Sequence, residues 1–317
     1  MLLNIIFLIA GLIILMYGAN FLVDGGSALA HRLKVSSMVI GLTVVAFGTS
    51  TPELVVNIVS SAEGSSALAL GNVMGSNIFN ILAILGVTAL IVPLGVQKTT
   101  TWVEIPLAAF AAILVLILVN GEPAGLITRA EGICLLCFFV IFLLYTLALA
   151  KYGGAGSGEE VVIKNYSMSK AILFIGLGLA GLIGGGRLLV TGAVQIAQHL
   201  GISERIIGLT IISIGTSLPE LATSVIAARK KNADIAIGNV VGSNIFNTFL
   251  ILGTSAVISP LEAPAGSATD LLVNVIASAL LFLFIFTGKG RKISRWEGAI
   301  FLALYLGYLI FILNKTA

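Results

Sequence analysis

The sequence predicts an all-α integral membrane protein with ten transmembrane helices, arranged as two inverted repeats of five helices each. The first observation behind this prediction is composition. Of the 317 residues, 58% are apolar and only 10% are charged, and the mean hydropathy is +1.12. An ordinary soluble domain carries about 25% charged residues. The second observation is an internal repeat at a constant spacing. The composition excludes a soluble globular protein and indicates a chain embedded in a lipid bilayer.

Apolar stretches of about 20 residues are long enough to cross a bilayer as a helix. Ten such stretches occur, at residues 2–22, 36–60, 68–91, 103–120, 128–150, 169–190, 206–228, 235–258, 270–287 and 297–313. We expect the first five-helix repeat to cover 1–150 and the second to cover 169–317. Residues 151–168 between them form the most polar stretch of the chain, which is typical of a linker.

Lys and Arg are distributed unevenly between the predicted loops. Thirteen of the 17 follow helices 1, 3, 5, 7 and 9, and the positive-inside rule assigns loops of this kind to the cytoplasm. We therefore expect a multi-pass protein of the cell membrane. The linker between helices 5 and 6 is expected to be cytoplasmic, and both termini are expected to be extracellular.

The repeat appears when 167 is added to a residue number in the first half. The segment GLTVVAFGTSTPEL at 41–54 matches GLTIISIGTSLPEL at 208–221. The segment ALGNVMGSNIFN at 69–80 matches AIGNVVGSNIFN at 236–247, with ten of the 12 positions identical. Because each half contains an odd number of helices, the second half enters the membrane from the opposite side. Inverted repeats are a recurrent plan of secondary transporters, with the substrate site near the midplane.

Two carboxylates, Glu53 and Glu220, lie well inside apolar stretches and occupy equivalent positions of the repeat. A carboxylate at this depth costs at least about 2.5–3.5 kcal/mol on insertion scales. A buried ion pair is one alternative, but no Lys or Arg is expected deep enough to pair with either residue. A protonated carboxyl group in a packed core is another. The interpretation that we favour is a cation site, in which the positive partner comes from outside the chain.

Hydroxyl and amide oxygens surround both carboxylates in the same pattern. A Thr and a Ser lie within one helical turn before each Glu, so that their oxygens can converge. The Pro directly before each Glu removes a helical hydrogen bond and frees a backbone carbonyl. A Ser and an Asn spaced i, i+4 on a facing helix add two more side-chain oxygens. The side chains are Thr49, Ser50, Pro52, Ser76 and Asn80 in the first repeat, and Thr216, Ser217, Pro219, Ser243 and Asn247 in the second.

The predicted ligands are oxygen atoms only. Such a site suits Ca²⁺, which takes six to eight oxygen ligands, and it does not suit zinc or copper, which prefer nitrogen and sulfur. Two carboxylates neutralise one Ca²⁺, and Na⁺ takes oxygen ligands as well. Cys134 and Cys137 form a C-x-x-C pair inside the fifth apolar stretch. Because they have no second pair and no nearby His, we interpret them as structural.

These motifs resemble the pair of inverted alpha-repeats of the sodium/calcium exchanger family of cation/calcium antiporters, over essentially the whole chain. The motifs are GTSTPE at 48–53 with GNVMGSN at 71–77, and GTSLPE at 215–220 with GNVVGSN at 238–244. The resemblance is to prokaryotic-type members without a regulatory domain. It implies one calcium site and three sodium sites. The matching positions are Ala46, Thr49, Ser50, Glu53, Ser76 and Asn80, followed by Ser213, Thr216, Ser217, Glu220, Ser243 and Asn247.

Two positions depart from the pattern of the family. Ser213 stands where members commonly have Ala, a mild change if this position binds the ion through its backbone carbonyl. Asn247 stands where some relatives, including potassium-dependent ones, have Asp. This difference argues against potassium cotransport and leaves open whether protons can replace sodium.

The leading functional hypothesis is an antiporter that exchanges Na⁺ for Ca²⁺ by alternating access, electrogenically and with three Na⁺ for one Ca²⁺. An H⁺/Ca²⁺ antiporter, or another exchanger of monovalent for divalent cations, is the alternative. A channel would need a continuous hydrated path, and an intramembrane enzyme would need a nucleophile or a general base that the motifs lack. We expect no enzymatic activity, no cofactor and no nucleic-acid partner. The sequence is compatible with a monomer.

Overall fold

The computed structural model describes residues 2–64, 66–122, 124–152, 166–200, 213–263, 267–288 and 290–316, and almost all of these are helical. Eight helices in this part of the chain are long and apolar enough to cross a membrane, and one bent pair, 37–49 with 51–62, makes a ninth. The one predicted span not among these nine, 206–228, is the seventh along the chain and is described only from residue 213 onward. Its described part is helical.

The first half contains the helices α1 (Leu2–Leu33), α2 (Ser37–Ile40), α3 (Ala46–Thr49), α4 (Thr51–Ala62), α5 (Ser66–Ile78), α6 (Gly86–Ile91), α7 (Lys98–Trp102), α8 (Glu104–Asn120) and α9 (Arg129–Tyr152). Two π-helical segments interrupt them, η1 (Gly41–Val45) and η2 (Phe79–Leu85). The second half contains α10 (Met168–His199), α12 (Ser213–Thr216), α13 (Leu218–Arg229), α14 (Ala233–Ile245), η4 (Phe246–Leu252), α15 (Gly253–Ile258), α16 (Ser267–Phe284) and α17 (Arg295–Thr316).

The bounds of these elements repeat with the sequence. Helices α3 to α6 of the first half and α12 to α15 of the second begin and end at positions that differ by 167, and the two long π-helical segments obey the same spacing. Helices α9 and α17 begin 166 residues apart. The predicted fold class, two inverted repeats of membrane-spanning helices, is therefore confirmed. The proposed boundary between the halves lies largely at 153–165, outside the described residues, so the exact division stays a prediction.

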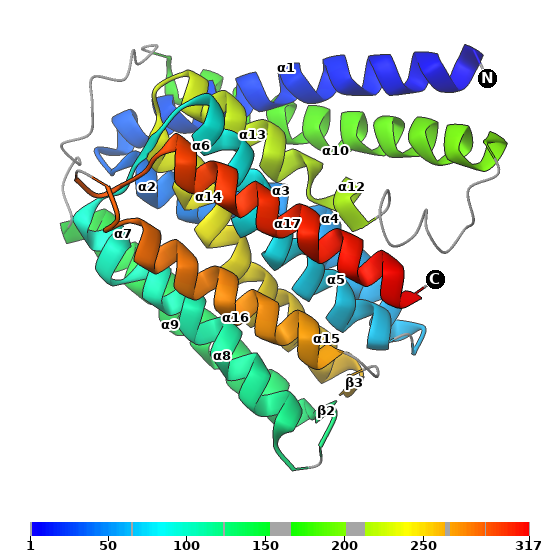
Figure 1. Cartoon of the computed structure of the whole chain (residues 1–317). Helices are drawn as coiled ribbons and strands as arrows, with labels where there is room; N and C mark the ends of the chain where they lie inside the picture. Colours follow the sequence, from blue (N-terminus) through cyan, green and yellow to red (C-terminus); the bar gives the residue numbers. More distant parts are fainter. Residues whose placement is uncertain are drawn as a thin grey trace.

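Burial identifies the centre of the molecule. In the span from α5 to α6, 78% of an 18-residue apolar segment is buried. In its repeat counterpart, from α14 to α15, 94% of the corresponding segment is buried. The remaining spans are between 17% and 39% buried. Figure 1 shows the same arrangement, with α14 in the middle and the long helices α1, α8, α9 and α10 at the periphery. The ion site predicted from Ser76, Asn80, Ser243 and Asn247 thus falls on the two central spans.

Four two-residue strands, which the sequence did not reveal, join the two halves. β1 (Leu94–Gly95) pairs antiparallel with β4 (Lys292–Ile293), and β2 (Leu126–Ile127) pairs antiparallel with β3 (Leu261–Glu262). Each pair combines one strand from each repeat, so the loops of one half are held by those of the other. Cys134 and Cys137 are free and exposed on α9, at positions that face away from the core.

The second span is broken, as the Pro before each Glu suggested. Helix α3 ends at Thr49, and α4 begins at Thr51 after a bend of 46°. Ser50 at the break has ψ near 5°, outside the helical range, and Pro52 sits in the first turn of α4. The second repeat has the same break at Ser217, with Pro219 in the first turn of α13. Proline is tolerated in the first helical turn because the amide that it lacks has no partner there.

Helices α1 and α10 lie side by side and antiparallel (Figure 1), along a line of glycines spaced seven residues apart. A Cβ atom on Gly18 would lie 2.7 Å from the backbone nitrogen of Leu182, and one on Gly185 would lie 2.6 Å from that of Leu15. Small residues at such positions let two helical backbones approach closely in a membrane. The backbones here are in direct contact, so no larger side chain fits without separating the helices.

We therefore expect the Gly185→Ala variant to be destabilised by about 1–3 kcal/mol, the usual cost of inserting a methyl group into packed space. Gly184→Ala is the matched control, because a Cβ atom on this neighbouring residue has no atom within 4 Å. Thermal unfolding in detergent measures both. Equal melting temperatures for the two variants would show that the contact between α1 and α10 is looser than described.

Candidate cation site

Glu53 and Glu220 face each other's repeat at the centre of the molecule. Each lies in the first turn of the helix that follows a break, Glu53 in α4 and Glu220 in α13, and each is 1% exposed. Unpaired amide groups at a helix N-terminus carry a partial positive charge, which stabilises a carboxylate there. The breaks at Ser50 and Ser217 thus place an N-terminus under each buried charge, which an unbroken helix would not do.

The serine at each break contacts the carboxylate of the other repeat. Ser50 Oγ donates a hydrogen bond to Glu220 Oε1 at 2.9 Å, and Ser217 Oγ lies 2.9 Å from Glu53 Oε1. The sequence had suggested that Ser50 converges with Glu53 of its own helical turn. Instead, the bend at Ser50 turns its hydroxyl group across the interface between the repeats. Each repeat thus donates one serine hydrogen bond to the glutamate of the other repeat.

The serines of the two central spans complete this layer. Ser243 Oγ lies 3.3 Å from Glu220 Oε1, and Ser76 Oγ lies 3.1 Å from Ser217 Oγ. Both serines are fully buried or nearly so, at 0% and 1% exposed. The hydroxyl groups therefore surround one oxygen of each carboxylate and leave the other oxygen to a different partner.

Four buried oxygen atoms in this region have no hydrogen-bond partner. They are Glu53 Oε2, Glu220 Oε2, Asn80 Oδ1 and Asn247 Oδ1. A buried acceptor left without a partner costs about 1–3 kcal/mol, and more if it is charged. No Lys or Arg in the described part of the chain forms an ion pair with either carboxylate, as the sequence predicted. Two pairs of equivalent oxygens, one pair from each repeat, thus lack the positive partner that a bound cation would supply.

Asn80 and Asn247 are presented by π-helical turns. Asn80 is the second residue of η2, and Asn247 is the second residue of η4. A π-helical turn holds an extra residue, shifts the side chains that follow, and is often found at functional sites. The sequence placed both residues on regular helices at i, i+4 from a Ser. The structure keeps that spacing but ends the regular α-helix just before each Asn.

Among the remaining predicted ligands, Thr49 and Thr216 also interact with the carboxylate of the other repeat, Thr49 with Glu220 and Thr216 with Glu53. Thr49 Oγ1 lies 3.0 Å from Asn239 Oδ1, and the carbonyl oxygen of Ala46 accepts from Ser50 N at 3.0 Å and from Thr49 Oγ1 at 3.3 Å. Ala46 could bind an ion through this oxygen only by sharing it with two donors. Thr216 lines a cavity beside the site. Ser213 begins α12, but its side chain lies outside the described residues.

A network of buried amides orients Asn80 and Asn247, and the sequence analysis missed it. Asn80 Nδ2 donates to Asn244 Oδ1 at 2.9 Å, and Asn247 Nδ2 donates to Asn77 Oδ1 at 3.1 Å. Asn77 Nδ2 in turn donates to Thr248 Oγ1 at 3.0 Å. Since the amide nitrogens are occupied in this way, the Oδ1 atoms of Asn80 and Asn247 face away from the network. The signal was present in the sequence, because Asn77 and Asn244 both follow the Ser of the repeated Gly-Ser-Asn motif.

The sequence also underestimated how many carboxylates are buried. Glu104 and Glu297 are 0% exposed, although the sequence placed them near helix ends. Both lie in the first turn of a helix, α8 or α17, where helix packing covers them. Tyr145 donates a hydrogen bond to Glu104, and Thr287 Oγ1 lies 2.6 Å from Glu297 Oε1. Neither residue joins the cluster around Glu53 and Glu220.

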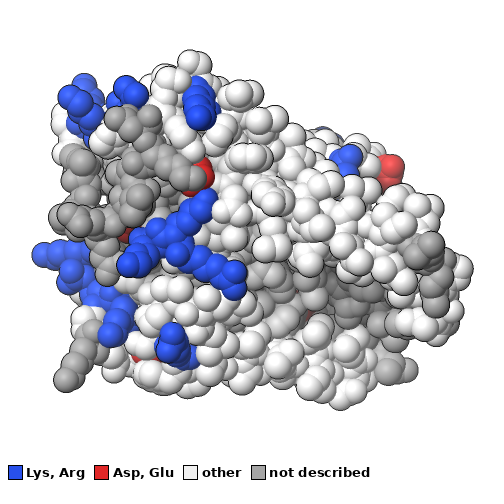
Figure 2. All heavy atoms as spheres, turned by 90° about the horizontal axis from the view of Figure 1, so that it is seen from above, with Lys and Arg blue, Asp and Glu red and all other residues white. Residues whose placement is uncertain are grey.

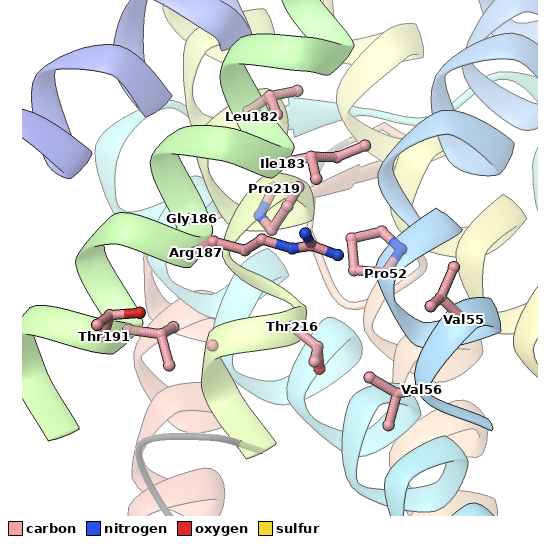
Figure 3. Close-up of a pocket in the computed structure, with 12 residues that line it drawn as sticks. Pro52, Val55, Val56, Leu182, Ile183, Gly186, Arg187, Thr191, Thr216 and Pro219 are labelled. Carbon is pink, nitrogen blue, oxygen red and sulfur yellow. The ribbon is translucent and has the colours of Figure 1, made fainter. Parts of the chain in front are cut away.

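A cavity of about 280 Å³ lies beside the cluster, lined by α4, α10 and the junction of α12 and α13. Pro52, Pro219 and Thr216 are among its lining residues (Figure 3), so it reaches the two broken turns that carry the carboxylates. The carboxylates themselves stay covered. Arg187 also lines the cavity. Because α10 continues to His199, Arg187 does not lie at the end of its helix.

The donor set determines what the cluster can hold. Its available atoms are carboxylate, amide and hydroxyl oxygens, and the described residues contain no group of three or more His, Cys, Asp or Glu side chains. Hard cations such as Ca²⁺ prefer oxygen ligands in flexible cages, whereas softer metals require nitrogen or sulfur. The geometry therefore fits an ion such as Ca²⁺ or Na⁺ and offers no nucleophile or imidazole base.

Comparisons with known proteins agree with this chemistry. A family model described as "Sodium/calcium exchanger protein" matches residues 3–148 and 170–314. The chain is 39% identical to the "Putative antiporter CaxA" of Alkalimonas amylolytica, over 97% of this chain and 98% of that protein. It is 32% identical to the "Sodium/calcium exchanger MaX1" of Methanosarcina acetivorans, over 97% of both.

Its fold matches a solved structure of the sodium-calcium exchanger NCX_Mj, soaked with 10 mM Na⁺ and zero Ca²⁺. The TM-score is 0.81 at 36% identity, over 96% of this chain and 97% of that one. A family model that covers both halves, relatives matched over nearly their whole length and a shared fold all lead to one assignment. The chain belongs to the sodium/calcium exchanger family, whose members are membrane transporters and not enzymes.

Proposed function

We propose that this protein exchanges Na⁺ for Ca²⁺ at the site formed by Glu53 and Glu220. The observation that carries the proposal is the set of four buried oxygens without partners, two from each repeat. The family supports transport of Na⁺ and Ca²⁺. The ligands that we propose are the twelve residues expected from the sequence, with Glu53, Glu220, Asn80 and Asn247 contributing the unpaired oxygens and the others completing the shell.

Charge balance suggests why the ions alternate. Two carboxylates carry a charge of −2, which one Ca²⁺ or a set of Na⁺ ions can neutralise. Leaving such charges buried without a partner costs several kcal/mol each, so the empty site is expected to close with difficulty. Because only the loaded site closes easily, the protein exchanges ions and does not leak them. If three Na⁺ replace one Ca²⁺, each cycle moves one net positive charge across the membrane.

The orientation that we propose has both termini outside the cell. Figure 2 shows Lys and Arg gathered at one end of the molecule, whereas both chain ends lie at the opposite end in Figure 1. In the proposed topology the span with Glu53 runs toward the side of the chain ends, and Val55 and Val56 follow Glu53. The span with Glu220 runs away from that side, and Thr216 precedes Glu220. The cavity that these residues line therefore lies on the side of the chain ends. Under the positive-inside rule, this conformation is open toward the outside.

Transport assays in proteoliposomes test the proposed coupling. Vesicles loaded with Na⁺ and diluted into Na⁺-free buffer with radioactive Ca²⁺ are expected to accumulate Ca²⁺, and an inside-positive potential should accelerate the uptake because net positive charge leaves. A pH gradient without Na⁺ should not drive it. Uptake driven equally well by the pH gradient would support the H⁺/Ca²⁺ alternative. Rapid uptake without any gradient or counter-ion would indicate a channel.

The amide network gives a second expectation. Replacing Asn244 with Ala removes the acceptor that holds Asn80 Nδ2, so Asn80 Oδ1 is no longer held toward the site. A net hydrogen bond is worth about 1 kcal/mol, which corresponds to a roughly fivefold weaker calcium affinity. Isothermal titration calorimetry measures this change.

Asn274→Ala is the matched control for this variant. Asn274 is also buried, at 1% exposed, but its Nδ2 faces the sulfur of Met74 at 3.8 Å and its Oδ1 has no hydrogen-bond partner, so its side chain forms no hydrogen bond with a proposed ligand. Its substitution should leave calcium affinity unchanged even if it lowers stability. Equal loss of affinity in both variants would mean that the effect of Asn244 is one of general packing.

A further inference from the structure

Arg187 is a charged residue in the membrane-spanning helix α10, and it is exposed to the cavity beside the site. Figure 3 shows its side chain extending from α10 across the cavity toward Pro52, past Pro219. Arg187 forms no hydrogen bond or ion pair with any described residue. Among the described residues nothing compensates the charge of its guanidinium group, which lies in a space that touches both broken turns.

The position of this charge matters for ions that use the cavity. Pro52 and Pro219 directly precede Glu53 and Glu220, and Thr216, one of the proposed ligands, is part of the same wall. A cation moving between the cavity and the carboxylates therefore passes close to the guanidinium group. Electrostatic repulsion in a cleft with low-dielectric walls is stronger than in bulk water.

The position equivalent to Arg187 in the first repeat carries no charge. The repeat counterpart of Arg187 is Asn20, which is neutral. The ammonium group of Lys230 lies beside it, with Nζ donating to the backbone oxygen of Asn20 at 3.1 Å. Lys230 also forms an ion pair with Asp24 at 2.7 Å, so its charge is compensated. The two positions that are equivalent in the repeat, Arg187 and Asn20, therefore differ in charge.

We propose that Arg187 is a specificity-determining residue that lowers the affinity for Ca²⁺ more than the affinity for any single Na⁺ at the cavity-facing side of the site. This inference rests on the proposed exchange function. The repulsion energy is proportional to the charge of the ion. If the guanidinium lowers the affinity for each Na⁺ by a given factor, it lowers the affinity for Ca²⁺ by the square of that factor.

With the orientation proposed above, the cavity opens to the outside. Arg187 then weakens Ca²⁺ binding and promotes its release at that face, while the face near Asn20 keeps its higher affinity for Ca²⁺. The gradient that the exchanger can sustain is set by its stoichiometry and does not change. What changes is the Ca²⁺ concentration at which each face is half-saturated. A lower affinity at the outer face suits a protein that exports calcium.

A series of charge variants tests the inference. Arg187→Lys keeps the charge, Arg187→Gln removes it and Arg187→Glu reverses it. Apparent affinities for Ca²⁺ and for Na⁺ are measured separately at each face, in proteoliposomes of known protein orientation and at constant ionic strength. For Arg187→Gln, a threefold gain in affinity per Na⁺ predicts about a ninefold gain for Ca²⁺. Arg187→Glu should repeat both steps, Arg187→Lys should resemble the wild type, and the opposite face should not change.

Three results would overturn the proposal: equal gains for the two ions, a Lys variant that behaves like the Gln variant, or affinities unchanged by any substitution. The last result is expected if Arg187 only anchors α10 by extending its charge to the membrane surface. Failure of the proposed function itself is distinguishable, because the wild-type protein would then show no exchange of Na⁺ for Ca²⁺.

Discussion

Two carboxylates are buried at the centre of a membrane protein, and neither is paired with a lysine or an arginine of the described part of the chain. Glu53 and Glu220 could not stay charged there without help, because the cost of burying an unpaired charge exceeds what one hydrogen bond returns. The break in each helix places the partial positive charge of a helix N-terminus next to each carboxylate. Ser50 and Ser217 each donate a hydrogen bond to the carboxylate of the other repeat. The part that the protein does not supply is a positive charge, and this makes the site dependent on a bound ion.

The inverted repeat explains both the symmetry of the site and its limits. The repeated sequence places equivalent helix breaks, equivalent π-helical turns and equivalent amides at the interface between the two halves. An exchanger needs two access routes that are related in this way but never open together. The symmetry fails where the two routes have different tasks. Arg187 on one side and Asn20 on the other occupy equivalent positions with different charge, and the structure of the site itself stays nearly symmetric.

Much of this could be predicted from the sequence, because hydropathy and an offset of 167 residues are properties of the sequence itself. The spans, the inverted repeat and the membrane fold followed from them, as did the buried position of Glu53 and Glu220. Features that depend on three-dimensional packing did not follow. Residues within one helical turn were expected to converge, whereas the bend at Ser50 sends its hydroxyl group to the other repeat. The π-helical turns at Asn80 and Asn247 depend on neighbouring helices, which periodicity does not reveal.

Calorimetry of calcium binding tests the central claim most directly, with wild-type protein, Glu53→Gln, Glu220→Gln and the control Glu104→Gln. The control removes a carboxylate that is just as buried but lies outside the cluster. Loss of one charge from a buried charge pair typically costs about 2–5 kcal/mol. We therefore predict calcium affinity at least about thirtyfold weaker in both site variants and unchanged in the control. Wild-type affinity in either folded site variant would contradict the account.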